Sequence, residues 1–163
     1  LRDSSLVARR IAPAQSWLCA SPGYLAQRGL PQNPAALAEH DCLVYTYGRH
    51  IPEWHLHDQH GHQHRIAVRG RLQVNNGEFL LAAAERDRGI VLMPDFIVAD
   101  AVRAGRLVRL LPGYTGAPHA IYALYPGSRH VSAKVRAFVD FLIEQFGSEV
   151  GSARCAPGTH AIR

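Results

Sequence analysis

Short apolar runs along this chain alternate with segments in which apolar residues recur every three or four positions. The first pattern is typical of buried β-strands and the second of amphipathic helices. We expect strands at residues 6–11, 17–20, 43–47, 72–75, 90–93, 107–111 and 120–125, and helices at 21–29, 33–40, 75–89, 95–104 and 132–146. The last helix is expected to end at Gly147 and to bury one face, formed by Val135, Phe138, Val139, Leu142 and Phe146.

The most informative segment runs from residue 74 to residue 94. Asn75 stands where a helix N-cap is expected, and Glu78 three residues later makes a capping-box variant. Gly89 stands where a helix C′ glycine is expected, and residues 90–93 are typical of a buried parallel strand. Such a unit points free N–H groups from a helix start toward the carboxyl edge of a sheet. Open α/β sheets bind anions and small ligands at that edge.

The alternation of strands and helices predicts an α/β fold with mostly parallel strand pairing. The strands at 6–11 and 17–20 and the last unit, 120–146, bracket a self-contained middle of the chain. This layout is typical of a two-lobed protein whose chain leaves one lobe, builds the other and returns.

Residues 53–56 and 65–68 flank a glycine-containing loop and are predicted to form a β-hairpin. Its histidines are His55, His57, His60, His62 and His64. Imidazoles at this alternate spacing could meet across the hairpin, so zinc or nickel chelation is chemically possible. No cysteine or carboxylate spacing completes a closed site, and a solvated polar face is favoured. We therefore expect no metal site.

Charge and cysteine content narrow the function classes. The net charge is +5, and Lys134 is the only lysine among 18 basic residues. The arginines are scattered, which favours solvated side chains over a nucleic-acid-binding surface. Cys19, Cys42 and Cys155 are widely spaced without a CxxC pair, so neither a zinc ribbon nor a disulfide framework is expected. Small buried thiols in a reducing cytoplasm are favoured over a redox sensor.

Neither catalysis nor membrane insertion is indicated. Ser4, Ser5 and Ser21 lack a GxSxG context, and no paired carboxylates stand out, so no catalytic residue is assigned. No run approaches the 18 apolar residues of a membrane span.

Seven short motifs follow one another along the chain. They lie at Asp3–Arg10, Leu18–Leu25, His40–Leu43, the Trp54 hairpin, Asn75–Glu78, Gly89–Pro94 and Lys134–Leu142. Their identity and order resemble the effector (co-inducer)-binding domain of LysR-type transcriptional regulators, from residue 1 to about residue 147.

The resemblance implies an α/β fold of the type 2 periplasmic-binding-protein-like kind, with two α/β lobes joined by crossover strands and lobe I incomplete. Residues 1–16 would be a lobe I remnant with the first crossover, 17–117 lobe II, 118–147 the return crossover and closing helix of lobe I, and 148–163 a flexible tail. It also implies DNA binding through an N-terminal winged helix-turn-helix domain absent here, and homodimers or homotetramers in the cytoplasm without membrane contact.

The resemblance further implies a small anionic effector held in the cleft between the lobes. The expected effector-binding residues are Ser4, Asn75, Asn76, Gly77, Met93 and Pro94. The Asn–Asn–Gly helix start would offer amides to a carboxylate, and the Met–Pro pair would offer apolar surface. Without the resemblance, a plain N-cap with no ligand is the favoured interpretation of this helix start.

These observations support an effector-sensing regulatory domain of a bacterial LysR-type regulator, needing no cofactor and working by a population shift. The alternative is a solute-binding protein of a transport system, which shares the fold. The absence of a disulfide framework and the regulator-like motifs argue against that alternative. The residues that precede Leu1 would decide between the two.

Overall fold

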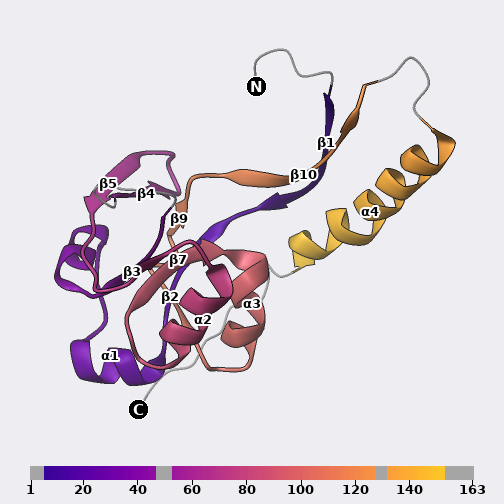
Figure 1. The fold of residues 1–163 in the computed structure, drawn as a ribbon. Coiled ribbons are helices and arrows are strands. Elements are labelled where there is room, and N and C mark those ends of the chain that lie inside the picture. Colours follow the sequence, from indigo (N-terminus) through magenta and orange to yellow (C-terminus); the bar gives the residue numbers. More distant parts are fainter. Residues whose placement is uncertain (1–5, 47–52, 128–131, 153–163) are drawn as a thin grey trace. The chain divides into compact units, whose positions relative to one another are not determined.

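A computed structural model describes residues 6–46, 53–127 and 132–152, with only the backbone described for 148–152. The chain divides into two compact units (Figure 1). Unit 1 combines Leu1–Ala14 with His119–Arg163, and unit 2 is Gln15–Pro118. Among the described residues, no helix combines the length and the apolar character needed to cross a membrane.

Unit 1 is a two-stranded antiparallel ribbon with one long helix. β1 (Leu6–Ala14) pairs with β10 (His119–Pro126), with a register irregularity between Arg10 and Ala12. α4 (Ala133–Ser152) contacts β1. The predicted stop at Gly147 is wrong, because the helix continues to Ser152. A Cβ at Gly147 would lie 3.5 Å from the carbonyl oxygen of Ile11, so this glycine fits close helix–strand packing.

The core of unit 1 is small. Its buried residues are Ile11, Ala12 and Val139, with Ala123, Tyr125, Leu142 and Ile143 packed against them. The predicted apolar face of α4 is therefore only partly correct. Phe138 and Phe146 are 61% and 47% exposed in this chain. Periodicity marks an apolar stripe on a helix but does not say how much of it a partner covers.

Unit 2 is built on a five-stranded sheet. In order across the sheet, its strands are β6 (Gln73–Val74), β3 (Cys42–Tyr45), β7 (Ile90–Pro94), β2 (Ser16–Ala20) and β8 (Val108–Leu110). β3 runs parallel to β6 and β7, whereas β2 runs antiparallel to β7 and β8. The sheet is thus mixed, and the prediction of mostly parallel pairing is wrong. An apolar run marks a strand but carries no information on its direction.

Three helices and a 3-10 segment complete the main part of unit 2. They are α1 (Pro22–Arg28), η1 (Pro34–Glu39), α2 (Gly77–Glu85) and α3 (Asp95–Arg103). Ser21 and Asn33 cap α1 and η1 as the Ser–Pro and Asn–Pro pairs predict, and each side-chain oxygen accepts a backbone N–H. Gly105, with φ +71°, follows the end of α3, as predicted.

The predicted hairpin is confirmed as β4 (Glu53–Asp58) and β5 (Gln63–Ala67). A third strand, β9 (Tyr114–Gly116), pairs with β4 and was not predicted. Its three residues are too short a run to show a period.

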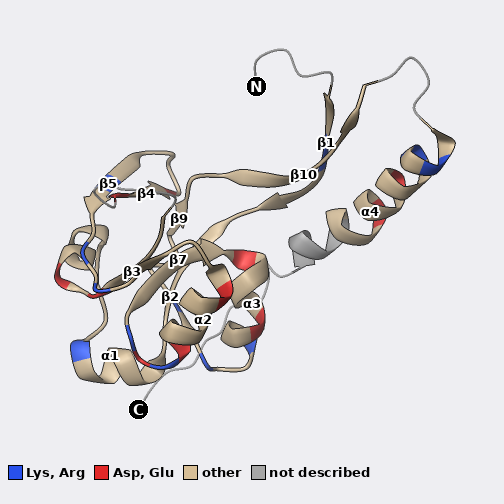
Figure 2. Ribbon diagram, in the orientation of Figure 1, with Lys and Arg blue, Asp and Glu red and all other residues tan. Residues whose placement is uncertain are grey.

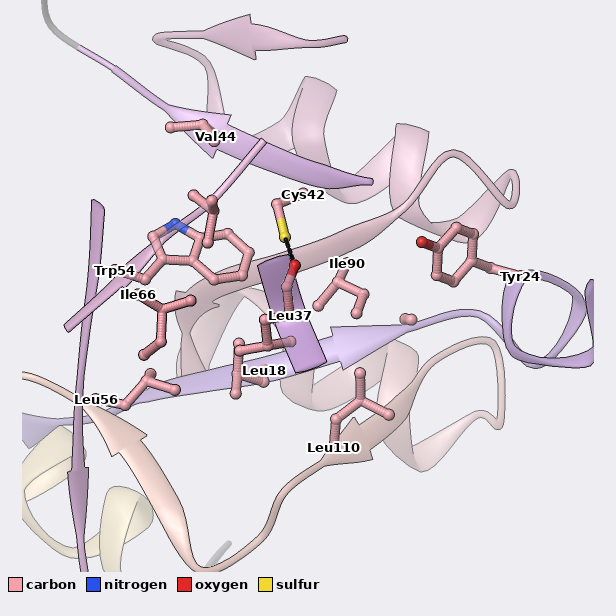
Figure 3. Close-up of a cluster of buried hydrophobic side chains, with 12 residues drawn as sticks. Leu18, Tyr24, Leu37, Cys42, Val44, Trp54, Leu56, Ile66, Ile90 and Leu110 are labelled. Atoms are coloured by element: carbon pink, nitrogen blue, oxygen red, sulfur yellow. Dashed lines mark hydrogen bonds between the residues drawn. The ribbon is translucent and has the colours of Figure 1, made fainter. Parts of the chain in front are cut away.

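Side chains of alternate residues in the five-stranded sheet pack into two separate hydrophobic clusters, one on each face. Leu18, Cys42 and Ile90 join side chains of α1, η1 and the hairpin in one cluster (Figure 3). Their sequence neighbours Cys19, Leu43 and Val91 join side chains of α2 and α3 in the other cluster. This is the two-residue period of a strand buried on both faces. The sheet is therefore a rigid platform whose edges position the loops described next.

Candidate functional site

The carboxyl ends of the three parallel strands β6, β3 and β7 lie at one edge of the sheet. Beyond β3, the N–H of Thr46 donates to the carbonyl of Val74 at 3.0 Å and continues the pairing. The chain leaves β6 directly into α2 and leaves β7 directly into α3. Two helices therefore begin beside this edge, each presenting backbone N–H groups of its first turn.

The first helix start is capped by Asn76. Its side-chain oxygen accepts the N–H of Phe79 at 2.9 Å. Asn75, predicted to be the cap, lies one residue outside, and the predicted capping box with Glu78 is therefore wrong. Two consecutive asparagines made the sequence ambiguous by one position. Glu78 still lies in the first turn, where the helix dipole stabilises a carboxylate.

Gly77 and Met93 lie close together under this helix start. A Cβ on Gly77 would lie 3.4 Å from Met93 Cε and 3.5 Å from Ile97 Cδ1. The absence of a side chain at Gly77 thus lets α2 begin against the end of β7 and the first turn of α3. Met93 is 2% exposed and belongs to the core, whereas Pro94 is half-buried. Ser4 lies outside the described residues.

The second helix start carries a buried carboxylate that sequence reasoning missed. Asp95 is 7% exposed, and its Oδ1 accepts the N–H of Phe96 at 3.0 Å. The N–H of Asp95 donates to the carbonyl of Gln15 at 2.7 Å. The start of α3 therefore has an internal anion, while the cap of α2 is a neutral amide. An Asp after a Met–Pro strand end is the only sequence sign of this arrangement.

Three of the five hairpin histidines contact one carboxylate, that of Asp58. Asp58 Oδ2 lies 3.1 Å from His62 Nδ1 and 3.4 Å from His64 Nε2. Asp58 Oδ1 accepts the N–H groups of His60 and His62, each at 2.9 Å. Burial alone would raise the pKa of Asp58, but these hydrogen bonds lower it well below its usual range. In the part of the chain that the structure describes, no group of three or more metal-ligating side chains could hold a metal ion.

Cys19 and Cys42 are fully buried free thiols, in the positions expected of small hydrophobic residues. Burial raises the pKa of each thiol to about 12. Cys155 lies outside the described residues. The two described cysteines are therefore unreactive thiols in the folded chain.

Basic residues are dispersed over several elements (Figure 2). In unit 1, Arg9 pairs with Asp140 at 2.9 Å, and in unit 2 Arg106 pairs with Glu85 at 2.8 Å. This distribution agrees with the expected solvated arginines.

A family model described as LysR substrate binding domain matches residues 1–147. The chain is 33% identical over 151 residues to the HTH-type transcriptional regulator CrgA of Neisseria meningitidis serogroup B, covering 92% of this chain and 50% of that protein. It is 37% identical over 150 residues to the HTH-type transcriptional regulator PtxR of Pseudomonas aeruginosa, covering 91% and 47%. The chain thus spans about half the length of these curated relatives.

Solved structures agree in fold. The regulatory domain of CrgA from Neisseria meningitidis matches with a TM-score of 0.76 and 32% identity, over 90% of this chain and 72% of that one. The regulatory domain of AphB from Vibrio vulnificus matches with a TM-score of 0.72 and 34% identity, over 88% and 70%. These relatives are transcriptional regulators, which argues against the solute-binding alternative. The predicted periplasmic-binding-protein-like α/β fold is confirmed, and this chain belongs to the LysR family of transcriptional regulators, as its substrate-binding domain.

Proposed function

We propose that this chain is the effector-sensing part of a cytoplasmic LysR-type regulator, without enzymatic activity, that binds a small anion at the carboxyl edge of β6, β3 and β7. The observation that carries the proposal is the start of α2, where a neutral asparagine caps a helix that begins at the sheet edge. The starting point is the family membership, since effector binding is the function of this domain.

The α2 start has the chemistry that an anion requires. Its backbone N–H groups carry the positive end of the helix dipole, which favours a negative charge by about 0.3–2 kcal/mol, depending on burial. Asn75 is exposed and adds a second side-chain amide. The start of α3 is less suitable, because Asp95 already places a carboxylate there.

We propose contacts from Asn75, Asn76 and Gly77 to the anionic group and from Pro94 to the apolar body of the effector. Met93 contributes indirectly, because its side chain packs beneath Gly77 at the start of α2. Ser4 remains a contact that the family resemblance implies.

Effector binding would favour one arrangement of the regulatory domain over another. A ligand shifts such an equilibrium only by its difference in affinity for the two states. In the full-length regulator, a homodimer or homotetramer, this shift would change how winged helix-turn-helix domains engage their operator.

Asn76→Asp in the full-length regulator tests the assignment. Asp caps a helix as well as Asn does, so folding should be preserved, while the new negative charge faces the effector anion. We expect the effector concentration for half-maximal response in a reporter assay to rise at least tenfold, with operator binding unchanged in the absence of effector. Asn76→Leu, which fills the same space with an apolar side chain, should abolish the response altogether.

Asn33→Asp is the matched control. Asn33 caps η1 in the same unit, by a hydrogen bond to the N–H of Ala36 at 3.1 Å. This variant introduces the same charge away from the carboxyl edge and should respond normally. A normal response of Asn76→Asp, or equal losses in both variants, would move the effector site elsewhere.

A further inference from the structure

A cavity of about 790 Å³ opens in unit 2 along α2, from Phe79 in its first turn to Arg86 at its end. It lies between α1 and α2, beside the amino ends of the same three parallel strands. Asp41 precedes β3, Arg71 precedes β6 and Arg88 precedes β7, and all three line the cavity. The charged residues of the cavity therefore lie at the opposite end of these strands from the proposed effector contacts, and the cavity volume is in the usual range of small-molecule sites.

Two glycines allow the segments that precede β6 and β7 to lie close to the start of β3. A Cβ on Gly70 would overlap the carbonyl oxygen of Cys42, and a Cβ on Gly89 would overlap the carbonyl oxygen of Asp41. The N–H of Ile90 donates to Asp41 and the N–H of Cys42 donates to Arg69, both at 2.8 Å. The residue after Gly70 and the residue before Gly89 are the two arginines, so the close approach holds Arg71 and Arg88 on either side of β3.

Only some of the charged side chains that line the cavity have a hydrogen-bond or ion-pair partner. Asp87 accepts a hydrogen bond from Ser21 Oγ at 2.6 Å, and Asp41 lies 4.0 Å from Arg28. Arg86 donates to the carbonyl of its own helix at Ala82. Arg71 and Arg88 have no acceptor among the residues that the structure describes. Both acidic groups are thus engaged, while two guanidinium groups are free to bind an anion.

Part of the cavity wall is apolar. Leu43 and Leu72 line the strand side, and Phe79 and Ala83 line the helix side. Phe79 is 55% exposed, so a large aromatic side chain that lines the cavity is accessible to solvent. An apolar wall beside two free guanidinium groups suits a ligand with a ring and an acidic group.

We propose that this cavity is a second ligand site, which binds a small aromatic anion through Arg71 and Arg88 with its ring against Phe79. The two arginines precede β6 and β7, which lie on either side of β3 at a backbone separation of roughly 10 Å. Two arginine side chains can span that distance to meet at one carboxylate, phosphate or sulfonate. The anion contacts of this site, Arg71 and Arg88, differ from the effector contacts proposed at the α2 start.

Calorimetric titration of the 163-residue chain with naphthalene-1-sulfonate tests the proposal, with 1-naphthalenemethanol as the neutral analogue. We expect the sulfonate to bind and the alcohol to bind at least tenfold more weakly. Arg71→Gln combined with Arg88→Gln should raise the Kd for the sulfonate at least tenfold. Since neither guanidinium has a described acceptor, the double variant loses no native hydrogen bond and should fold.

Arg65→Gln combined with Arg136→Gln is the matched control, because it removes the same charge from exposed positions that do not line the cavity. It should change the Kd less than twofold. Equal losses in the two double variants, or no binding by the unaltered chain, would each overturn the second site. A failed effector assignment at Asn76 would leave the difference between the two double variants unchanged.

Discussion

At the scale of single residues, the most constrained positions are glycines that lie against a neighbouring backbone. Gly89 illustrates this, because the sequence suggested a helix C′ residue and the structure assigns it another role. α2 ends at Glu85, and the left-handed conformation after it belongs to Asp87, with φ +62°. Gly89 is instead required for close approach to Asp41. Both uses of glycine follow a helix by a few residues, so the sequence does not distinguish them.

Gly70→Ala should destabilise the chain strongly. The added Cβ would overlap the backbone of Cys42, and backbone at the centre of a sheet has little freedom to move. We expect a loss of about 3 kcal/mol or more in the free energy of unfolding, measured by urea denaturation. Gly113→Ala is the control, because a Cβ there meets nothing within 4 Å and should change stability by less than about 0.5 kcal/mol. Similar losses in both variants would contradict the close-approach argument.

The helix start at the candidate site was predicted to within one position. An Asn–Asn–Gly run after an apolar strand indicates a helix start, but either asparagine can be its cap, and only the hydrogen bond to Phe79 identifies Asn76. The burial of Asp95 and the arginines of the second cavity could not be predicted. Both depend on contacts between segments far apart in the chain, which periodicity and spacing do not encode.

At the scale of elements, local patterns predicted most helices and strands but not their directions or their partners. The Ser–Pro and Asn–Pro starts and the hairpin are confirmed because each is fixed by a few adjacent residues. The antiparallel pairing of β2 and the addition of β9 to the hairpin depend on the path of the whole chain.

The hairpin should lose stability in acid through Asp58. Its pKa is lowered in the folded chain, so the stabilisation is complete above the unfolded pKa, near 4, and is lost as the pH falls below that value. In the described residues, His62 and His64 face this carboxylate from β5 and its turn, with Tyr114 of β9 packed on His64. Between pH 5 and pH 3, the free energy of unfolding should therefore fall less in Asp58→Asn than in the unaltered chain.

Asp100→Asn provides the comparison for this measurement. Asp100 is 82% exposed at its side chain, and its one described ion pair, with Arg103, is on the surface of α3. The variant should retain the acid dependence of the unaltered chain. An unchanged acid dependence in Asp58→Asn would show that its hydrogen bonds do not persist in solution.

At the scale of the whole molecule, the two units differ in how much core supports them. Unit 2 contains both large clusters of buried residues, whereas the described part of unit 1 buries Ile11, Ala12 and Val139. Seven short motifs in order were enough to predict the family and fold, since order along the chain is what a sequence records directly. The incomplete lobe I that the resemblance implies would leave apolar side chains of unit 1 uncovered. In unit 1, Tyr122 and Leu124 of β10 and Phe138 and Phe141 of α4 are each more than half exposed.

A small core should make unit 1 the first part of the chain to open. Local opening costs less where few apolar contacts are broken, so amides of β1, β10 and α4 should exchange with deuterium faster than those of β2, β3 and β7. Val139→Ala should remove about 2 kcal/mol from unit 1 alone and accelerate exchange there. Val98→Ala, a fully buried change between α3 and the sheet of unit 2, should accelerate exchange only within Gln15–Pro118. Peptide-resolved mass spectrometry distinguishes the two patterns, and equal acceleration of both units by Val139→Ala would show that the chain opens as a single cooperative body.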